Sequence, residues 1–128
     1  MNTFIILLRG VTPIGKDKVL MAPLRAALTE AGLQGVRTYI QSGNIIATSD
    51  LNPPDIENLV HKVISHRFGG DIAVLARTAR QFSSILKCNP FVNMDYKKLY
   101  FSLLDATPNK KLLQHFLSID FSPDQYCM

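Results

Sequence analysis

The sequence predicts an α+β fold in which helices pack on an antiparallel sheet. Apolar runs of strand length alternate with stretches in which apolar residues recur every three or four positions. Glycine, proline and asparagine separate these segments, as expected for turns and helix ends. Over residues 1–77 the segments follow the order β-α-β-β-α-β, which predicts a ferredoxin-like unit. The chain has 128 residues, enough for this unit and part of a second.

The first strand and helix are the clearest elements. Residues 3–9 are almost continuously apolar, which is typical of a strand covered on both faces. The apolar residues of 19–31 fall at helical spacing, and Gly32 provides a left-handed stop. Pro23 must lie in the first turn, because a proline deeper in a helix costs about 3 kcal/mol.

A hairpin follows this helix. Residues 36–41 and 45–49 have the composition of strands, and Gly43-Asn44 between them favours a two-residue turn of type II′ or I′. Tyr39 is expected to pack against a cross-strand neighbour. Asn52-Pro53 then predicts the cap and first position of a second helix, and residues 71–77 form the fourth strand.

Residues 78–128 predict a helix and the start of a second β-α-β unit. Thr78 and Gln81 have the spacing of a capping box at the start of a helix. A strand is expected over 98–104 and a helix over 108–117, in the same order as the first strand and helix. No strand follows before Met128, so we expect this second unit to be incomplete and the chain truncated.

The predicted topology brings several polar segments to one edge of the sheet. The first two strands run parallel, so their carboxyl ends meet there, together with the amino end of the first helix and its free N–H groups. The connection that contains Arg67 is also expected at this edge. The candidate ligand-binding residues are Arg9, Gly10, Lys16, Lys18, Gln41, Ser42, Gly43 and Asn44.

Cationic side chains, small polar donors and a helix amino end are the groups that bind phosphate or carboxylate. The sequence therefore favours a binding module for a phosphate-bearing small molecule. A purely structural role stays open, because Ser and Asn beside Gly are also ordinary hairpin residues. Self-association, for instance as a homodimer, is an alternative. RNA binding is disfavoured because residues 45–48 carry no aromatic side chain, and an enzyme handling phosphate or acyl groups is disfavoured because no catalytic constellation is present.

Composition narrows the setting. The net charge of +4 is compatible with an anionic partner. Cys88 and Cys127 fit no metal spacing and indicate a reducing, cytoplasmic compartment, and Cys88 is expected to be a buried structural thiol. His61 and His66 are five residues apart, which is unsuited to a shared zinc site. No nucleotide-loop or cofactor motif is present, and no apolar run reaches the ~20 residues that span a bilayer.

The first helix, its preceding loop and the hairpin resemble the bacterial family known as domain of unknown function 1697. The matching residues are Leu8-Arg9-Gly10, Lys16, Lys18, Met21, Leu24-Arg25 and the string Thr38-Tyr39-Ile40-Gln41-Ser42-Gly43-Asn44. Residues 11–15 depart from the family, which usually has Ile-Asn-Val-Gly-Gly there. The family also continues beyond a position equivalent to residue 128. The resemblance implies a fold and a surface of interest, without a chemical activity.

Overall fold

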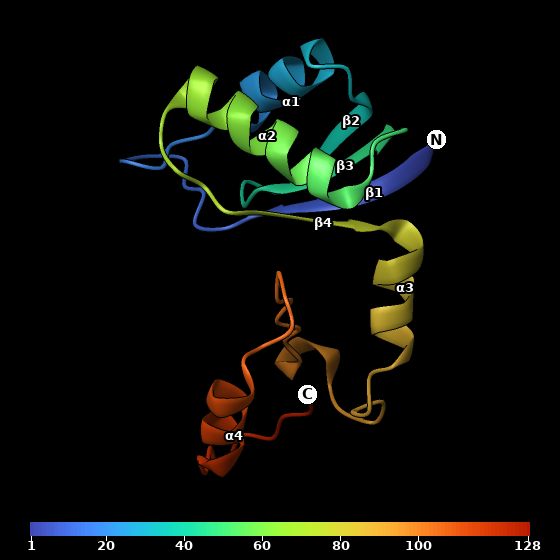
Figure 1. Cartoon of the computed structure of the whole chain (residues 1–128), viewed down its shortest axis with the longest axis vertical. Helices are drawn as coiled ribbons and strands as arrows, with labels where there is room; N and C mark the ends of the chain where they lie inside the picture. Colours follow the sequence, from blue (N-terminus) through green and yellow to red (C-terminus); the bar gives the residue numbers. More distant parts are fainter. The chain divides into compact units, whose positions relative to one another are not determined.

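An antiparallel sheet of four strands organises the first part of the chain (Figure 1). The computed structural model describes residues 1–128, which form two units, Met1–Lys87 and Cys88–Met128. The strand order β2-β3-β1-β4 confirms the predicted ferredoxin-like arrangement. The strands are β1 (Asn2–Leu8), β2 (Gln34–Tyr39), β3 (Asn44–Ser49) and β4 (Val74–Thr78).

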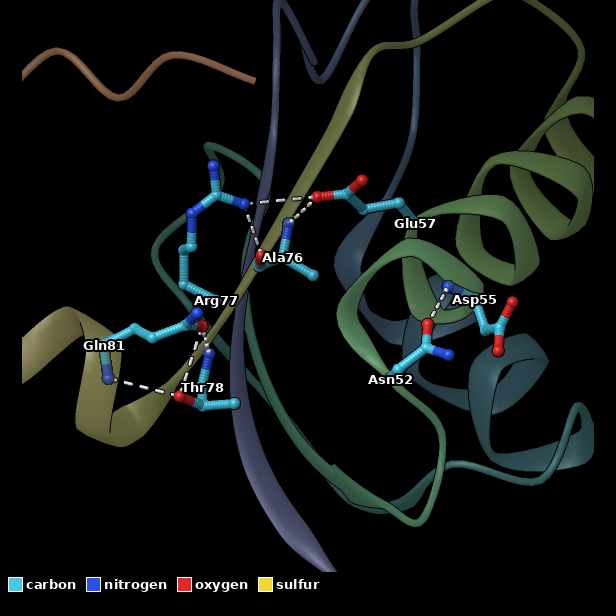
Figure 2. Close-up of polar contacts among 7 residues, drawn as sticks. All are labelled: Asn52, Asp55, Glu57, Ala76, Arg77, Thr78 and Gln81. Carbon is cyan, nitrogen blue, oxygen red and sulfur yellow. Dashed lines mark hydrogen bonds and ion pairs between the residues drawn. The ribbon is translucent and has the colours of Figure 1, made fainter. Parts of the chain in front are cut away.

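Two helices, α1 (Met21–Glu30) and α2 (Pro53–Phe68), cover one face of this sheet (Figure 1). The predicted start of α2 is confirmed, since the Asn52 side chain accepts a hydrogen bond of 2.9 Å from the Asp55 N–H (Figure 2). Helix α1 begins at Met21, two positions later than expected, so that Pro23 lies in its first turn.

The hydrophobic core lies between the helices and the sheet. Along β1, Phe4, Ile6 and Leu8 are buried, whereas Ile5 and Leu7 on the opposite face are half-buried. The prediction that β1 is covered on both faces holds fully for only one face, because α1 and α2 both pack on that side and the residues of the other face are half-buried. None of the helices combines the length and the apolar character that a membrane span requires.

The hairpin turn differs from the predicted one. Tyr39 pairs with Asn44, so four residues, 40–43, form the loop, and Asn44 already belongs to β3. Ile40 has φ 53° and Gly43 has φ 77°. A Cβ on Gly43 would lie 2.7 Å from the Cβ of Leu8. Glycine is required at this position by the close approach of β1 as well as by the backbone angle.

The outer edge of β4 is covered by side chains. Glu57 of α2 accepts a hydrogen bond of 2.8 Å from the Ala76 N–H, and the Arg77 guanidinium donates to the Ala76 carbonyl at 2.7 Å (Figure 2). Glu57 and Arg77 also form an ion pair at 3.5 Å. These side chains satisfy backbone groups that an edge strand otherwise leaves unpaired.

Helix α3 (Ala79–Lys87) completes the first unit and packs against β1 and β4. Its predicted capping box is confirmed. The Thr78 N–H donates to the Gln81 side chain at 2.9 Å, and the Gln81 N–H donates to the Thr78 hydroxyl at 3.2 Å (Figure 2).

The second unit, Cys88–Met128, contains a short 3-10 helix, η1 (Tyr96–Lys98), and helix α4 (Lys110–Ser118). Helix α4 confirms the helix expected there. The strand expected over 98–104 is not formed, because the residues between η1 and α4 belong to no helix or strand. The rings of Phe116, Phe121 and Tyr126 form a cluster with centroids 5.0 to 5.5 Å apart.

Candidate functional site

The end of β1 and the hairpin lie side by side at one edge of the first unit. The Leu8 N–H donates to the Gly43 carbonyl at 2.9 Å, so Arg9 directly follows the contact with the hairpin. The Gln41 side-chain amide donates to the Val19 carbonyl at 2.8 Å and joins the hairpin to the β1–α1 loop. We call residues 9–20 and 40–44 the carboxyl edge.

The loop between β1 and α1 is fixed by its own backbone. The Thr12 N–H donates to the Asp17 carbonyl and the Val19 N–H to the Thr12 carbonyl, both at 3.1 Å. At its start, the Arg9 N–H donates to the Ala73 carbonyl at 3.0 Å, and Gly10 turns the chain with φ 72°. The loop is therefore an ordered support for the side chains that it carries.

Three exposed cations stand on this support. The side chains of Arg9, Lys16 and Lys18 form no ion pair and no hydrogen bond. Asp17 is the only carboxylate within residues 9–20, so this loop carries a net charge of +2. These charges are available to an anionic ligand.

The hairpin residues divide into structural and available groups. The Asn44 side-chain NH2 donates to the Ser42 hydroxyl oxygen at 2.6 Å and to the Tyr39 carbonyl at 3.3 Å. Together with the Gln41 bond to the loop, this means that both amide donors already stabilise the hairpin. Gly43 is buried against β1. The hydroxyl proton of Ser42 and the side-chain oxygen of Asn44 remain available for a ligand.

Helix α1 presents its amino end at the carboxyl edge. Its N-cap residue, Leu20, makes no side-chain capping bond, and the first turn contains no acidic residue. The first N–H groups of an α-helix have no intrahelical partner, and they carry a partial positive charge. Here that charge adds to the charge of the neighbouring loop.

Arg67 does not contribute to the carboxyl edge, contrary to expectation. Its guanidinium pairs with the Glu30 carboxylate at the last residue of α1. A shallow, open depression of about 350 Å³ adjoins this pair and uses the last turns of both helices. It is lined by Ala27, Glu30, Ala31, Lys62, Val63, His66 and Arg67, none of which belongs to the carboxyl edge. The depression and the cationic loop are thus separate features.

Three apolar side chains at or next to the carboxyl edge are exposed, which the sequence did not lead us to expect. Tyr39 is 70% exposed, contrary to the expected cross-strand packing, and Ile40 beside it is 63% exposed. Ile14 in the facing loop is 77% exposed. The sequence does contain a signal for this exposure. Tyr39 and Ile40 lie directly next to the hairpin turn, and side chains in loops usually face solvent.

The open face of the sheet carries aliphatic side chains on its two central strands. Ile5 of β1 pairs with Ile46 of β3, and both are half-buried. Phe4, the only aromatic residue of β1, is buried in the core. Proteins of this fold that bind RNA stack bases on aromatic residues of such strands, and neither central strand offers one on this face.

No group of three or more His, Cys, Asp or Glu side chains is positioned to hold a metal ion. The imidazole of His61 instead lies 2.7 Å from the Asp71 carboxylate. Both cysteines are exposed, so the prediction that Cys88 is a buried structural thiol is wrong.

The fold and this edge define a ferredoxin-like α+β protein with an exposed cationic surface. Comparison with known sequences then gives the family: residues 1–128 match the family described as Protein of unknown function (DUF1697), and the chain belongs to it. The resemblance seen in the sequence is confirmed. No curated protein matches the sequence.

A solved structure is similar as well. It is described as the structure of conserved bacterial protein SP0830 from Streptococcus pneumoniae, and it matches with a TM-score of 0.73 and 26% sequence identity. The match covers 94% of this chain and 67% of the other. Both comparisons support the fold.

Proposed function

We propose that this protein binds a phosphate-bearing small molecule at the carboxyl edge. The observation that carries the proposal is the position of Arg9, Lys16 and Lys18, three unpaired cations on one ordered loop that leads into the uncapped end of α1. Cations of a folded surface are commonly solvated singly. An ordered group of them beside free helix N–H groups favours a ligand of opposite charge.

Each group has a distinct role in this proposal. Arg9 supplies the planar, two-pronged donor that suits phosphate oxygens, and the two lysines act as point charges. The N–H groups of Met21 and Ala22 at the start of α1 and the Ser42 hydroxyl are neutral donors, whereas Pro23 has no N–H to offer. The helix dipole contributes only about 0.3–1 kcal/mol at an exposed site, whereas each hydrogen bond to a charged group contributes about 1.5–3 kcal/mol. Arg9 and the lysines therefore dominate binding.

Titration calorimetry with inorganic phosphate and a panel of sugar phosphates tests the proposal. We expect binding by the intact chain and a dissociation constant at least about ten-fold larger for Arg9→Ala, a loss of roughly 1.4 kcal/mol. Arg80→Ala is the matched control, because Arg80 is an exposed arginine outside the carboxyl edge. Absence of binding by the intact chain, or equal binding by the Arg9→Ala and Arg80→Ala variants, would contradict the proposal.

Self-association through the second unit is a second candidate. Tyr100 is 90% exposed, and it lies in an apolar segment that belongs to no helix or strand. The four lysines and four aspartates of residues 88–128 balance, so two copies would meet without net repulsion between these units. Light scattering coupled to size exclusion tests this candidate. A concentration-dependent mass that falls to the monomer in Tyr100→Ser supports it, and a monomeric mass throughout rejects it.

A further inference from the structure

The side chain of Tyr39 belongs to the face of the sheet opposite α1 and α2, which we call the open face. Its neighbour Thr38 faces α1, because the Arg25 guanidinium donates to the Thr38 hydroxyl at 2.6 Å. Successive side chains of a strand point to opposite faces. The exposed ring of Tyr39 therefore lies on the opposite side from α1, at the end of β2.

Arg9 is placed toward the same face. Leu8 is buried in the core, and the ladder continues through the bond from the Arg9 N–H to Ala73, so the alternation of side chains directs Arg9 away from the core. Tyr39 pairs with Asn44, and Asn44 pairs with Leu7, two residues before Arg9. These three positions thus form a row across the open face, with Arg9 just beyond it.

The spacing of the row indicates what could bridge it. Neighbouring strands are about 4.8 Å apart and residues rise about 3.4 Å along a strand, so the Cα atoms of Tyr39 and Arg9 are about 12 Å apart. The Tyr39 and Arg9 side chains are long, so the ring and the guanidinium can lie closer together than the two Cα atoms. A ligand that joins a flat ring to a phosphate through a sugar spans the remainder.

Asn44 lies between these two side chains and retains an acceptor. Its NH2 group is held by Ser42 and Tyr39, which fixes the orientation of the side chain. Its carbonyl oxygen accepts no hydrogen bond. That oxygen is available to a hydroxyl of a sugar or an N–H of a base.

The backbone at this point is constrained. Ile40 has φ 53°, an unfavourable conformation for a β-branched residue. It is held between the Tyr39 carbonyl, which accepts from Asn44, and Gln41, whose amide donates to Val19. Strain of this kind persists only where surrounding bonds hold the backbone in place. Here these bonds fix the end of β2, which carries the exposed ring of Tyr39.

Resting on the proposed function, we infer that the phosphate-bearing ligand is a single nucleotide. Its base stacks on Tyr39, its phosphate binds Arg9 on the same face, and Asn44 accepts a hydrogen bond from the sugar or base. One exposed aromatic ring on this face suits one base. The aliphatic residues of β1 and β3 offer no second ring, which separates this site from a surface for an RNA strand.

Titrations with the four ribonucleoside 5′-monophosphates, ribose 5-phosphate and inorganic phosphate test the inference on the full chain. We expect at least one nucleotide to bind about 5-fold to 150-fold more tightly than ribose 5-phosphate, the range that stacking on an aromatic ring produces. Tyr39→Ala should remove this advantage and leave ribose 5-phosphate binding unchanged. Tyr39→Phe should retain the advantage of the nucleotide. Arg9→Ala should weaken the binding of all the phosphate compounds.

The outcomes separate the two proposals. If ribose 5-phosphate binds through Arg9 but no nucleotide binds more tightly, or if Tyr39→Ala keeps the advantage, the nucleotide inference is overturned and the phosphate site stands. If no phosphate compound binds, both are overturned. Unchanged thermal unfolding of the Tyr39 variants excludes misfolding as the cause of a loss.

Discussion

The Leu8 amide N–H donates to the Gly43 carbonyl oxygen across 2.9 Å, and this bond joins the end of β1 to the turn of the hairpin. The contact is so close that a side chain on Gly43 would overlap Leu8. The turn is therefore a packing element of the first unit, and the geometry of the carboxyl edge depends on a residue without a Cβ.

Gly43→Ala is expected to destabilise the protein more than Gly15→Ala. Both glycines have positive φ, 77° and 89°, so both substitutions introduce backbone strain of about 1–2 kcal/mol. Only Gly43 would also place a Cβ 2.7 Å from Leu8, because a Cβ on Gly15 meets nothing within 4 Å. Overlap of this kind adds about 1–3 kcal/mol. Urea unfolding measures the difference, and equal losses would contradict the packing role.

Ile40→Gly is expected to raise the free energy of unfolding. Glycine adopts φ near 53° without the steric cost of a β-branched residue. Glycine also loses more chain entropy on folding, but the removal of backbone strain should outweigh this loss. We expect a net gain of about 1 kcal/mol in the free energy of unfolding. Ile14→Gly is the control, since Ile14 is a similarly exposed loop isoleucine that lacks a positive φ. It should leave stability unchanged or lower it. A loss of stability in Ile40→Gly would show that the conformation is not strained.

Glu57→Ala is expected to weaken the outer edge of β4. The substitution leaves the Ala76 N–H without its acceptor at a partly buried position, which costs about 1–3 kcal/mol. Glu57→Gln keeps an acceptor oxygen and should recover most of the loss. Glu30→Ala removes an exposed ion pair with Arg67, which is worth at most about 1 kcal/mol. Chemical denaturation of the three variants measures these losses of stability. Similar losses in Glu57→Ala and Glu30→Ala would contradict the role of Glu57 as the acceptor for the Ala76 N–H.

The second unit contains a carboxyl group with an altered titration. The Ser122 hydroxyl and amide N–H both donate to Asp120, which lowers the pKa of this carboxyl below its usual value of about 3.8. Because the folded pKa is the lower one, the interaction stabilises the fold above pH 3.8 and is lost as pH falls through the folded pKa. Titration followed by NMR should show an upward shift in Ser122→Ala and none in Ser118→Ala. An unchanged pKa in Ser122→Ala would exclude the hydroxyl hydrogen bond as a cause of the lowered pKa.

The local patterns of the sequence predicted most of the first unit. Strand order and the meeting of the loop with the hairpin follow from topology, and the Thr78–Gln81 spacing is a local signal that the structure satisfies directly. The hairpin turn was mispredicted because local preference favours Gly43-Asn44 as a turn. The position of Gly43 is instead set by Leu8, a contact distant in sequence.

Two further errors have the same origin. Residues 98–104 have strand-forming composition, but composition does not reveal whether a pairing strand exists, and the structure forms no strand there. Arg67 was placed at the carboxyl edge from its position in the chain, whereas its pairing with Glu30 depends on how α1 and α2 cross. The exposure of Tyr39 is likewise a property of the folded surface.

Glu57 and Arg77 cover the outer edge of β4, so the two edges of the sheet in the first unit differ in how readily another polypeptide could pair with them. A peptide that extended this sheet by backbone pairing would find β4 obstructed, which leaves β2 as the accessible flank. Such a peptide would come to rest next to Tyr39. Peptide docking on that flank and small-molecule binding at the hairpin would then compete for the same few residues.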